Sequence, residues 1–174
     1  RYGRRQRQMC IRDSNKRYVI PSITKGNLTL TKKNKTILVT ASAKRLGKLI
    51  AHHLVREGWG VAVHYNKSKQ LAEETVDELL KMGGKVTLHQ ADLTITSDIN
   101  KLIKDLEEQD LIWSGLINNA GYFNYDNGVN FDSESLYNHM SVNFTAPTIL
   151  TQALAKYTLN LKKKKRNAQG FVIN

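Results

Sequence analysis

The sequence of 174 residues predicts an α/β fold, in which helices cover a parallel sheet. Short apolar runs rich in β-branched residues alternate along the chain with longer segments whose apolar residues recur at helical spacing. Strands and helices that alternate in this way require right-handed crossovers between parallel strands. These observations place one domain on residues 36–174, which is long enough to bury a core.

Five strands are expected, and each is a short apolar run. They cover residues 36–40, 61–65, 85–90, 115–118 and 171–174. Because the first crevice follows the first strand, the implied strand order is 3-2-1-4-5. This is the first part of a doubly wound dinucleotide-binding fold, with the sheet truncated after strand five.

Helical periodicity fills the intervals between these strands. A first stripe begins at Leu46 and ends at Gly58, with apolar residues at positions 46, 49, 50, 54 and 55. A second helix is capped by Ser68 and closed by Gly83, with a stripe at positions 71, 75, 79, 80 and 82. A third carries apolar residues at 99, 102, 103 and 106. A longer helical stretch covers residues 133–159, in two pieces around Pro147.

The net charge of +12 is concentrated in two segments. Residues 1–35 hold eleven of the 27 Lys and Arg and one of the 15 acidic residues, and residues 162–166, expected to form a solvated loop, are all basic. The body between them has no basic excess, so we expect no nucleic-acid partner. No apolar run approaches the roughly eighteen residues of a membrane span. One cysteine, Cys10, excludes an internal disulfide and a cysteine metal cluster.

Residues 1–35 are predicted to be a disordered or artefactual basic lead-in outside the fold. Residues 1–14 have no apolar periodicity, helix cap or turn signal, and they resemble the translated end of a sequencing read. A mitochondrial presequence is the alternative, because arginines dominate and acids are scarce. Such a presequence would need an amphipathic apolar face, which this segment lacks.

The loop after the first strand carries the first functional signal. Residues 38–47 read LVTASAKRLG: an apolar run stops at Thr40, crosses small and basic residues, and opens a helix at Gly47. Parallel-sheet proteins present a helix N-terminus to a phosphate in this way, because unpaired N–H groups and the positive end of the helix dipole face the anion. A second signal, Asn-Asn-Ala-Gly, stands at residues 118–121.

Together these motifs resemble those of the short-chain dehydrogenase/reductase (SDR) family, in which Thr-Gly-x3-Gly/Arg-Ile/Leu-Gly precedes Asn-Asn-Ala-Gly. Within that family the chain is most similar to the pteridine reductases and their bacterial relatives, through SAKRLG at residues 42–47 and HYNKS at residues 64–68. It departs from the family pattern at Ala41, where glycine is usual. The resemblance covers residues 35–174 and implies a Rossmann-type sheet.

The resemblance also implies which residues hold a dinucleotide. In the first loop and helix they are Thr40, Ala43, Lys44, Arg45, Leu46 and Gly47. At the later strand ends they are Asp92 and Leu93 at the adenine edge, and Asn119, Ala120 and Gly121 under the nicotinamide ribose. Asn118 is expected to brace the sheet. The alternative for Lys44 and Arg45 is a solvated loop.

The end of the second strand predicts NADPH as the cofactor. NADH-preferring relatives place an acid there, which would repel a 2′-phosphate. No acid occurs between Val61 and Ala72, and His64, Lys67 and Ser68 offer hydrogen-bond donors. A charge-assisted contact of about 1.5–3 kcal/mol corresponds to roughly a ten- to hundredfold preference. The alternative is that Lys67 is a surface lysine and Ser68 only a helix cap.

The family's chemistry is hydride transfer between a nicotinamide and a carbonyl or imine. The resemblance implies that Asn143, in VNFTAP at residues 142–147, anchors a proton-relay water. The family's Tyr-x3-Lys pair, the source of the proton, has no counterpart in these 174 residues, since Leu161 stands four residues after Tyr157. We therefore expect an enzyme as the parent protein and an inactive N-terminal fragment in this chain.

Phe123 matches the aromatic residue that stacks on the pterin in pteridine reductases, and Arg45 is placed to reach both pyrophosphate and substrate. The alternative is that Phe123 packs its own loop, because Tyr122 and Tyr125 flank it. Gly121 replaces the serine that is common in that subgroup. The histidines show no metal-ligand spacing, so no metal is expected.

The sequence therefore predicts an NADPH-dependent SDR oxidoreductase that reduces a pterin or a related C=N or C=O substrate. One alternative is a reductase of a 3-oxoacyl thioester or another carbonyl, and a second is a nucleotide-binding module without catalysis. We expect a small-molecule substrate, no membrane partner, a cytoplasmic location, and a homo-oligomeric parent, either a tetramer or a dimer.

Overall fold

The computed structural model describes residues 32, 34–125, 129, 132–164 and 168–174. The chain divides into two units, Arg1–Leu30 and Thr31–Asn174. The first unit lies outside the described residues, and so does nearly all of the predicted lead-in. The second unit contains every helix and strand described below.

Three residues that were assigned to the lead-in contribute to the second unit. Lys35 is buried and is the first residue of the first strand. Lys32 Nζ donates to Glu57 O at 2.6 Å, and Asn34 Oδ1 accepts from Lys85 Nζ at 2.6 Å. The predicted boundary at residue 36 is therefore too late, because the basic residues before it conceal the start of the strand.

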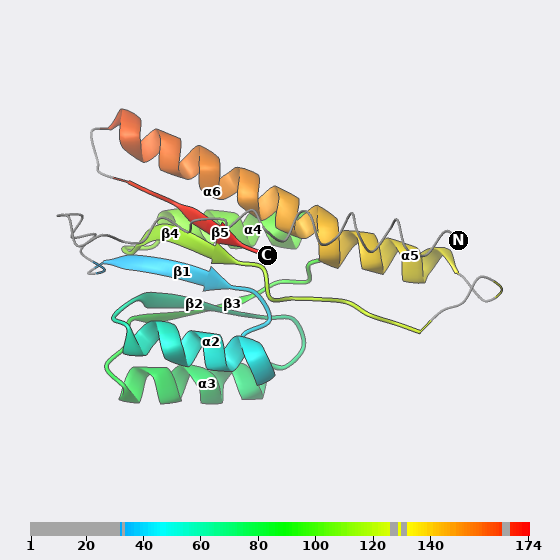
Figure 1. The fold of residues 1–174 in the computed structure, drawn as a ribbon, viewed down its shortest axis with the longest axis horizontal. Coiled ribbons are helices and arrows are strands. Elements are labelled where there is room, and N and C mark those ends of the chain that lie inside the picture. The colour runs from blue at the N-terminus through cyan, green and yellow to red at the C-terminus, as the bar shows by residue number, and fades with distance from the viewer. Residues whose placement is uncertain (1–31, 33, 126–128, 130–131, 165–167) are drawn as a thin grey trace, which may run out of the picture. The chain divides into compact units, whose positions relative to one another are not determined.

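Five parallel strands form one sheet in the order β3-β2-β1-β4-β5 (Figure 1). Their bounds are β1 Lys35–Val39, β2 Gly60–Tyr65, β3 Val86–Gln90, β4 Ile112–Ile117 and β5 Phe171–Ile173. The predicted α/β class and strand order are confirmed. β4 begins three residues earlier than predicted, since Trp113 and Ser114 join the strand where its register with β1 shifts.

Two helical layers cover the sheet (Figure 1). Helices α2 (Arg45–Arg56) and α3 (Lys69–Lys81) lie on one face, and α4 (Thr96–Glu108) and α6 (Ala146–Lys163) lie on the other. β1 supplies both cores by alternation: Ile37 and Val39 pack with α2 and α3, and Leu38 packs with α4 and α6. This central strand therefore has no side that faces water.

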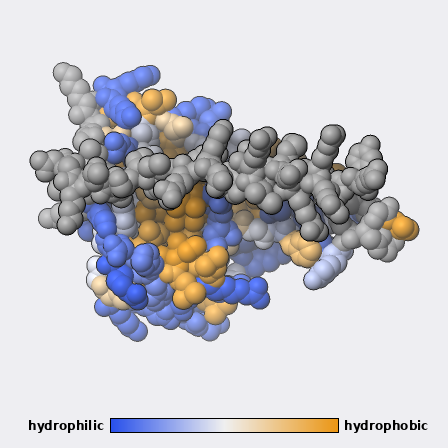
Figure 2. Space-filling view, in the orientation of Figure 1, coloured by the Kyte–Doolittle hydropathy of each residue, from blue (hydrophilic) through white to orange (hydrophobic). Residues whose placement is uncertain are grey.

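The predicted stripes of α2 and α3 are confirmed only in part, since Val55, Thr75 and Leu79 are buried but other members face outward. In α2 the buried residues are Gly47, Ala51 and Val55, while Leu46 and Leu49 are 63% and 67% exposed. In α3 the stripe is Ala72, Thr75 and Leu79, while Leu71, Leu80 and Met82 are exposed. In α2 the small residues Gly47 and Ala51 let the helix approach the sheet closely. Figure 2 shows apolar side chains at the surface over β1 and α2.

The long helical stretch is continuous, and its irregularity lies before Pro147. Helix α5 (Ser133–Met140) passes through a π-helical turn, η1 (Ser141–Thr145), directly into α6. Pro147 stands in the first turn of α6, directly after η1, and because proline has no N–H it cannot donate to a carbonyl of that turn. The two predicted pieces are confirmed as α5 and α6, but they are joined by a π-helical turn that ends just before Pro147 and not by a break at the proline. Lys162 and Lys163 also belong to α6, so the predicted basic loop begins later, and residues 165–167 lie outside the described residues.

Among the described residues, no helix is both long enough and apolar enough to span a bilayer.

Leu102 and Leu80 test which face of each helix stabilises the fold. Leu102 of α4 is 1% exposed in the core, and Leu80 of α3 is 50% exposed. Leu102→Ala should lower the free energy of unfolding by about 2–5 kcal/mol through lost burial and the cavity left behind. The same truncation at Leu80 should cost well under half as much. Urea titration of both variants checks the difference, and equal losses would contradict this packing.

Candidate functional site

A cleft of about 630 Å³ opens where the carboxyl ends of β1, β2, β3 and β4 meet the N-terminus of α2. This edge is the place where a doubly wound sheet changes direction, between β1 and β4, and where such sheets bind ligands. The predicted site residues that line the cleft are Ala43, Lys44, His64, Lys67, Ser68, Asp92, Leu93, Ala120 and Gly121.

Thr40, Gly47 and Asn119 lie behind the cleft and shape it. The Thr40 hydroxyl is buried, accepts from Asn119 N at 2.9 Å and Ala120 N at 2.8 Å, and donates to Ile117 O. Asn119 Nδ2 donates to Thr40 O at 2.9 Å and to Ala41 O at 3.2 Å. Neither Thr40 nor Asn119 lines the cleft, and the Thr40 hydroxyl and the Asn119 Nδ2 are engaged by the loop itself, so their predicted contact with a cofactor stays a prediction.

Two residues without a glycine's freedom adopt left-handed backbone in this loop. Ala41 and Arg45 both have φ of +52°. The side chains of Lys44, Arg45 and Leu46 are exposed at the start of α2, and of these only Lys44 lines the cleft. Left-handed φ at these two positions turns the chain from β1 into α2 within a few residues. The loop thus has left-handed backbone at two positions, neither of which is a glycine.

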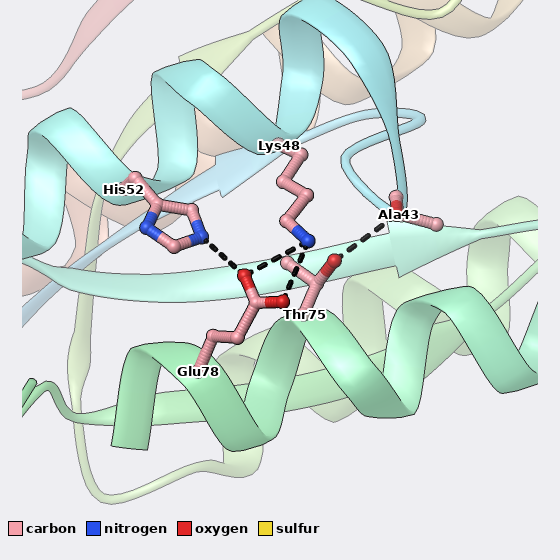
Figure 3. A network of polar contacts seen from close by, with 5 residues as sticks. All are labelled: Ala43, Lys48, His52, Thr75 and Glu78. Carbon is pink, nitrogen blue, oxygen red and sulfur yellow. Dashed lines mark hydrogen bonds and ion pairs between the residues drawn. The ribbon is translucent and has the colours of Figure 1, made fainter. Parts of the chain in front are cut away.

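Ala43, in the same loop, is held by the buried hydroxyl of Thr75 from α3. Thr75 is fully buried, and its Oγ1 donates to Ala43 O at 3.0 Å (Figure 3). Beside it, Lys48 Nζ of α2 lies 2.8 Å from the Glu78 carboxylate, and His52 Nε2 lies 3.0 Å from Glu78 Oε2 (Figure 3). The hydrogen bond from Lys48 is the main cause that lowers the pKa of Glu78. These contacts fix α2 and α3 against each other under the loop.

The structure corrects the role predicted for His64 at the end of β2. Its side chain is 2% exposed, and both ring nitrogens contact backbone: Nδ1 accepts from Ala41 N at 3.0 Å, and Nε2 lies 3.1 Å from Ala91 O. No ring N–H is left to donate to a phosphate. His64 was expected to be such a donor at the end of the second strand, but here the neighbouring loops cover it.

Lys67 and Ser68 follow β2 at the rim of the cleft, as predicted. Lys67 is exposed and Ser68 is half-buried at the first position before α3. The Ser68 side chain makes no capping hydrogen bond to the described residues, which corrects the predicted cap and leaves its hydroxyl available to the cleft.

Asp92, after β3, carries the negative charge of the cleft. Its Oδ1 accepts from Thr94 N at 2.9 Å and from Thr94 Oγ1 at 2.7 Å. Partial burial opposes ionisation of Asp92, but hydrogen bonds from Thr94 and Asn66 and the charge of Lys67 outweigh it, so the pKa of the carboxyl is lowered. Asp92 is therefore a fixed hydrogen-bond acceptor beside a cation at the rim.

Asn143 lies in the π-helical turn η1 and binds the segment that follows β4. Its Oδ1 accepts from Tyr122 N at 2.8 Å, and its Nδ2 donates to Tyr122 O at 2.8 Å. It lines a second hollow of about 710 Å³, together with Ala120, Phe144 and Pro147. The Asn143 side chain thus serves to hold the loop, and the loop forms part of both hollows.

Phe123 lies outside the residues that line the cleft and is 74% exposed. Its ring contacts Tyr125 at 5.0 Å and His139 at 6.3 Å between centroids. His139 Nε2 also accepts from Asn124 N at 3.3 Å, so α5 supports this loop from one side. Tyr157, by contrast, packs on Trp113 in the core.

Several residues of the site escaped the sequence-based prediction. Thr75 was counted only as part of an apolar stripe, although a threonine there signals a buried hydroxyl that needs an acceptor. Tyr65, Asn66, Thr94, Tyr122, Asn138 and Val142 also line the cleft. Their position follows from the strand ends and the π-helical turn, which no local pattern reveals. Among the described residues, no three His, Cys, Asp or Glu side chains gather as a metal site.

Gly47 tests how closely α2 must approach the loop. A Cβ at this position would lie 2.4 Å from Ala41 O and 2.6 Å from Asn119 Nδ2, whereas a Cβ at Gly121 would meet only Asn143 Oδ1 at 3.8 Å. Gly47→Ala should therefore destabilise the fold by about 1–3 kcal/mol or more through overpacking. Gly121→Ala, the matched control, should change stability by less than about 0.5 kcal/mol. Thermal melts of the two variants check this, and a harmless Gly47→Ala would contradict the loop geometry.

Several known proteins are similar to this chain in sequence or in fold. The 3-oxoacyl-[acyl-carrier-protein] reductase FabG of Staphylococcus epidermidis is 36% identical over 88 residues, which are 51% of this chain and 36% of that protein. The structure of FolM alternative dihydrofolate reductase 1 from Brucella canis, complexed with NADP, is 31% identical with a TM-score of 0.67, over 71% of this chain and 49% of that one.

A short chain dehydrogenase from Burkholderia cenocepacia J2315, in complex with NADP, is 27% identical with a TM-score of 0.68, over 71% of this chain and 50% of that chain. The chain thus spans about half the length, or less, of these relatives. The family model described as short chain dehydrogenase matches residues 35–174, the range that contains the whole sheet and both hollows. The chain belongs to the short-chain dehydrogenase/reductase family.

Proposed function

We propose that this chain binds NADP(H) and forms the cofactor-binding part of an oxidoreductase that reduces a pterin or a related C=N or C=O compound. The observation that carries the proposal is the cleft at the carboxyl edge of the sheet. The N-terminus of α2 meets this cleft, and Lys67 lies at its rim. Relatives that share 27% and 31% of their aligned residues carry NADP in their structures.

The residues present fit a phosphorylated dinucleotide. The N-terminus of α2 meets the cleft at Lys44, and backbone N–H groups in the first turn of a helix can bind an anion. Lys44 and Lys67 bring positive charge to the cleft, and no acid occurs between Val61 and Ala72 to oppose a 2′-phosphate. Asp92 offers a carboxylate oxygen to an exocyclic amine. When bound, the nicotinamide supplies the hydride.

The segment that follows β4 is held in place between the two hollows by hydrogen bonds from both sides. The loop after β4 is fixed by Thr40 from one side and by Asn143 from the other, so its backbone forms a rigid floor between the two hollows. A π-helical turn at Asn143 displaces backbone carbonyls from regular helical pairing, which suits a site for an ordered water. We propose that this turn serves the proton relay.

The pterin assignment rests on the aromatic residue after Gly121. Phe123 is exposed, and its ring is held edge-on by Tyr125 and His139. A fixed, solvent-facing ring beside the cofactor cleft suits stacking on a flat heterocycle. Similarity to FolM alternative dihydrofolate reductase 1 supports the same substrate class.

A 3-oxoacyl thioester is the second candidate substrate. It is favoured by the 36% identity to the acyl-carrier-protein reductase of Staphylococcus epidermidis. That similarity lies within 88 residues, about half of this chain.

We also propose that the parent protein is a homo-oligomer. Apolar side chains along α5, η1 and α6 are exposed, and they are Leu136, Tyr137, Met140, Phe144 and Leu159. A row of this kind on adjoining helical segments suits pairing with a second copy.

Lys67→Asp tests the cofactor preference. The wild-type chain should bind NADPH more tightly than NADH, and the variant should lose about ten- to a hundredfold of that ratio, because an attractive charge becomes repulsive. Nicotinamide fluorescence titrations of both cofactors give the ratio. Lys101→Asp makes the same charge change on α4, and it should leave the ratio as in wild type. If Lys67→Asp also leaves it unchanged, the 2′-phosphate is bound elsewhere.

Phe123→Ala tests the substrate class. In the presence of NADP⁺ the variant should bind 7,8-dihydrobiopterin about five- to a hundredfold more weakly, the range of about 1–3 kcal/mol known for ring stacking on bases. Its affinity for NADPH should change by less than about twofold. Calorimetric titration with dihydrobiopterin and with acetoacetyl-CoA separates the two substrate candidates. Equal weakening for pterin and NADPH would mean that Phe123 supports the loop.

A further inference from the structure

His64 is a buried residue whose two ring nitrogens both contact backbone atoms of neighbouring loops. It ends β2 and lies between the loops that follow β1 and β3. Its Nδ1 accepts from Ala41 N at 3.0 Å, and its Nε2 lies 3.1 Å from Ala91 O. One imidazole ring thus joins the carboxyl ends of three neighbouring strands of the sheet.

The His64 backbone is bonded to the same loop. His64 N donates to Ser42 Oγ at 3.1 Å, and Ser42 N donates to His64 O at 2.9 Å. Ser42 Oγ in turn donates to Val39 O at 2.8 Å. His64 therefore accepts hydrogen bonds from two consecutive backbone amides. Its side chain accepts from Ala41 N, and its backbone carbonyl accepts from Ser42 N.

Ala41 needs such an anchor because its backbone is unfavourable for a residue with a Cβ. Its φ is +52°, and left-handed backbone costs an L-residue roughly 1–2 kcal/mol. The Ala41 amide is also a partly buried donor, which would be costly to leave without an acceptor. An acceptor fixed in direction at His64 Nδ1 favours the one backbone conformation that aims the amide at it.

We infer that His64 is the positioning residue of the phosphate-binding loop: its ring accepts the Ala41 amide and so holds residues 41–43 in the shape that receives the dinucleotide. The inference deepens the proposed function and rests on it for the identity of the ligand. His64 touches no ligand in this role. It acts through Ala41, and the loop makes the contacts.

The contact to Ala91 determines which ring nitrogen can serve. A carbonyl oxygen accepts only from a protonated nitrogen, so Nε2 carries the hydrogen and Nδ1 keeps its lone pair for Ala41. Burial lowers the pKa of His64 to about 4, the Ala91 carbonyl and Asp92 oppose that shift, and His89 adds to it. The ring is therefore neutral near pH 7, as an acceptor at Nδ1 requires.

Two substitutions separate positioning from packing. His64→Asn places an amide oxygen near the position of Nδ1, where it can accept from Ala41, but it cannot reach Ala91. His64→Gln places an amide nitrogen near the position of Nε2, where it can donate to Ala91, but it leaves the Ala41 amide without an acceptor. His89 pairs directly with His64 in the sheet register, and within the part of the chain that the structure describes its side chain hydrogen-bonds only Thr87 Oγ1, at 2.8 Å. His89→Asn and His89→Gln are therefore matched controls.

The experiment measures two quantities on the full chain: amide hydrogen exchange at Ala41 by NMR, and the Kd for NADPH by fluorescence. His64→Gln should accelerate exchange at Ala41 about tenfold or more and weaken NADPH binding about tenfold, the effect of one lost buried hydrogen bond. His64→Asn should stay within about threefold of wild type in both. The His89 variants should match wild type.

Equal behaviour of the Asn and Gln variants, whether both like wild type or both impaired, would overturn the inference, since a packing role does not distinguish them. The two readouts also separate this inference from the proposed function. If no protein in the series binds NADPH while Ala41 exchange still follows the predicted order, the ligand assignment fails and the positioning role stands.

Discussion

The chain must leave the central strand and enter a helix within a few residues, and the rest of the site depends on how that turn is held. Residues 40–43 are hydrogen-bonded to three different elements of the fold. Thr40 is tied to β4 and the segment after it, Ala41 to His64 of β2, and Ala43 to Thr75 of α3. Because each anchor comes from a separate element, the loop has its shape only when sheet and helices are assembled. The cleft is therefore a property of the whole domain.

The order of strands and the location of the cleft could be predicted from local patterns. Apolar runs marked the five strands, and the loop at residues 38–47 marked the crevice, because strand burial and helix starts leave strong local signals. The faces of α2 and α3 could be predicted only in part. Leu46 and Leu49 satisfy the helical period as well as Ala51 does, and only the close approach at Gly47 shows which side faces the sheet.

Some of the predicted site residues lie in the cleft, and others bond to the fold itself. Lys67, Asp92 and Gly121 lie in the cleft as expected, since position at a strand end is enough to place them. Thr40, Asn119 and His64 were expected to contact a ligand but are occupied by backbone groups. Whether a polar side chain meets a ligand or its own fold depends on neighbours distant in sequence, such as Ala91 for His64. The π-helical turn at residues 141–145 is another case, because its sequence, SVNFT, differs little from that of an ordinary helix.

The left-handed residues Ala41 and Arg45 bear on how relatives of this chain can be found. A sequence search that requires glycine at these positions specifies a residue type. The fold requires only a left-handed φ, which Ala41 and Arg45 adopt here. Any side chain is admissible if the surrounding hydrogen bonds outweigh its strain, and asparagine or aspartate enters that region more easily than most residues. Homologous loops with alanine, asparagine or arginine in place of glycine would then share one backbone path while their motifs look unrelated. A structural fingerprint for this loop is better written in dihedral angles than in letters.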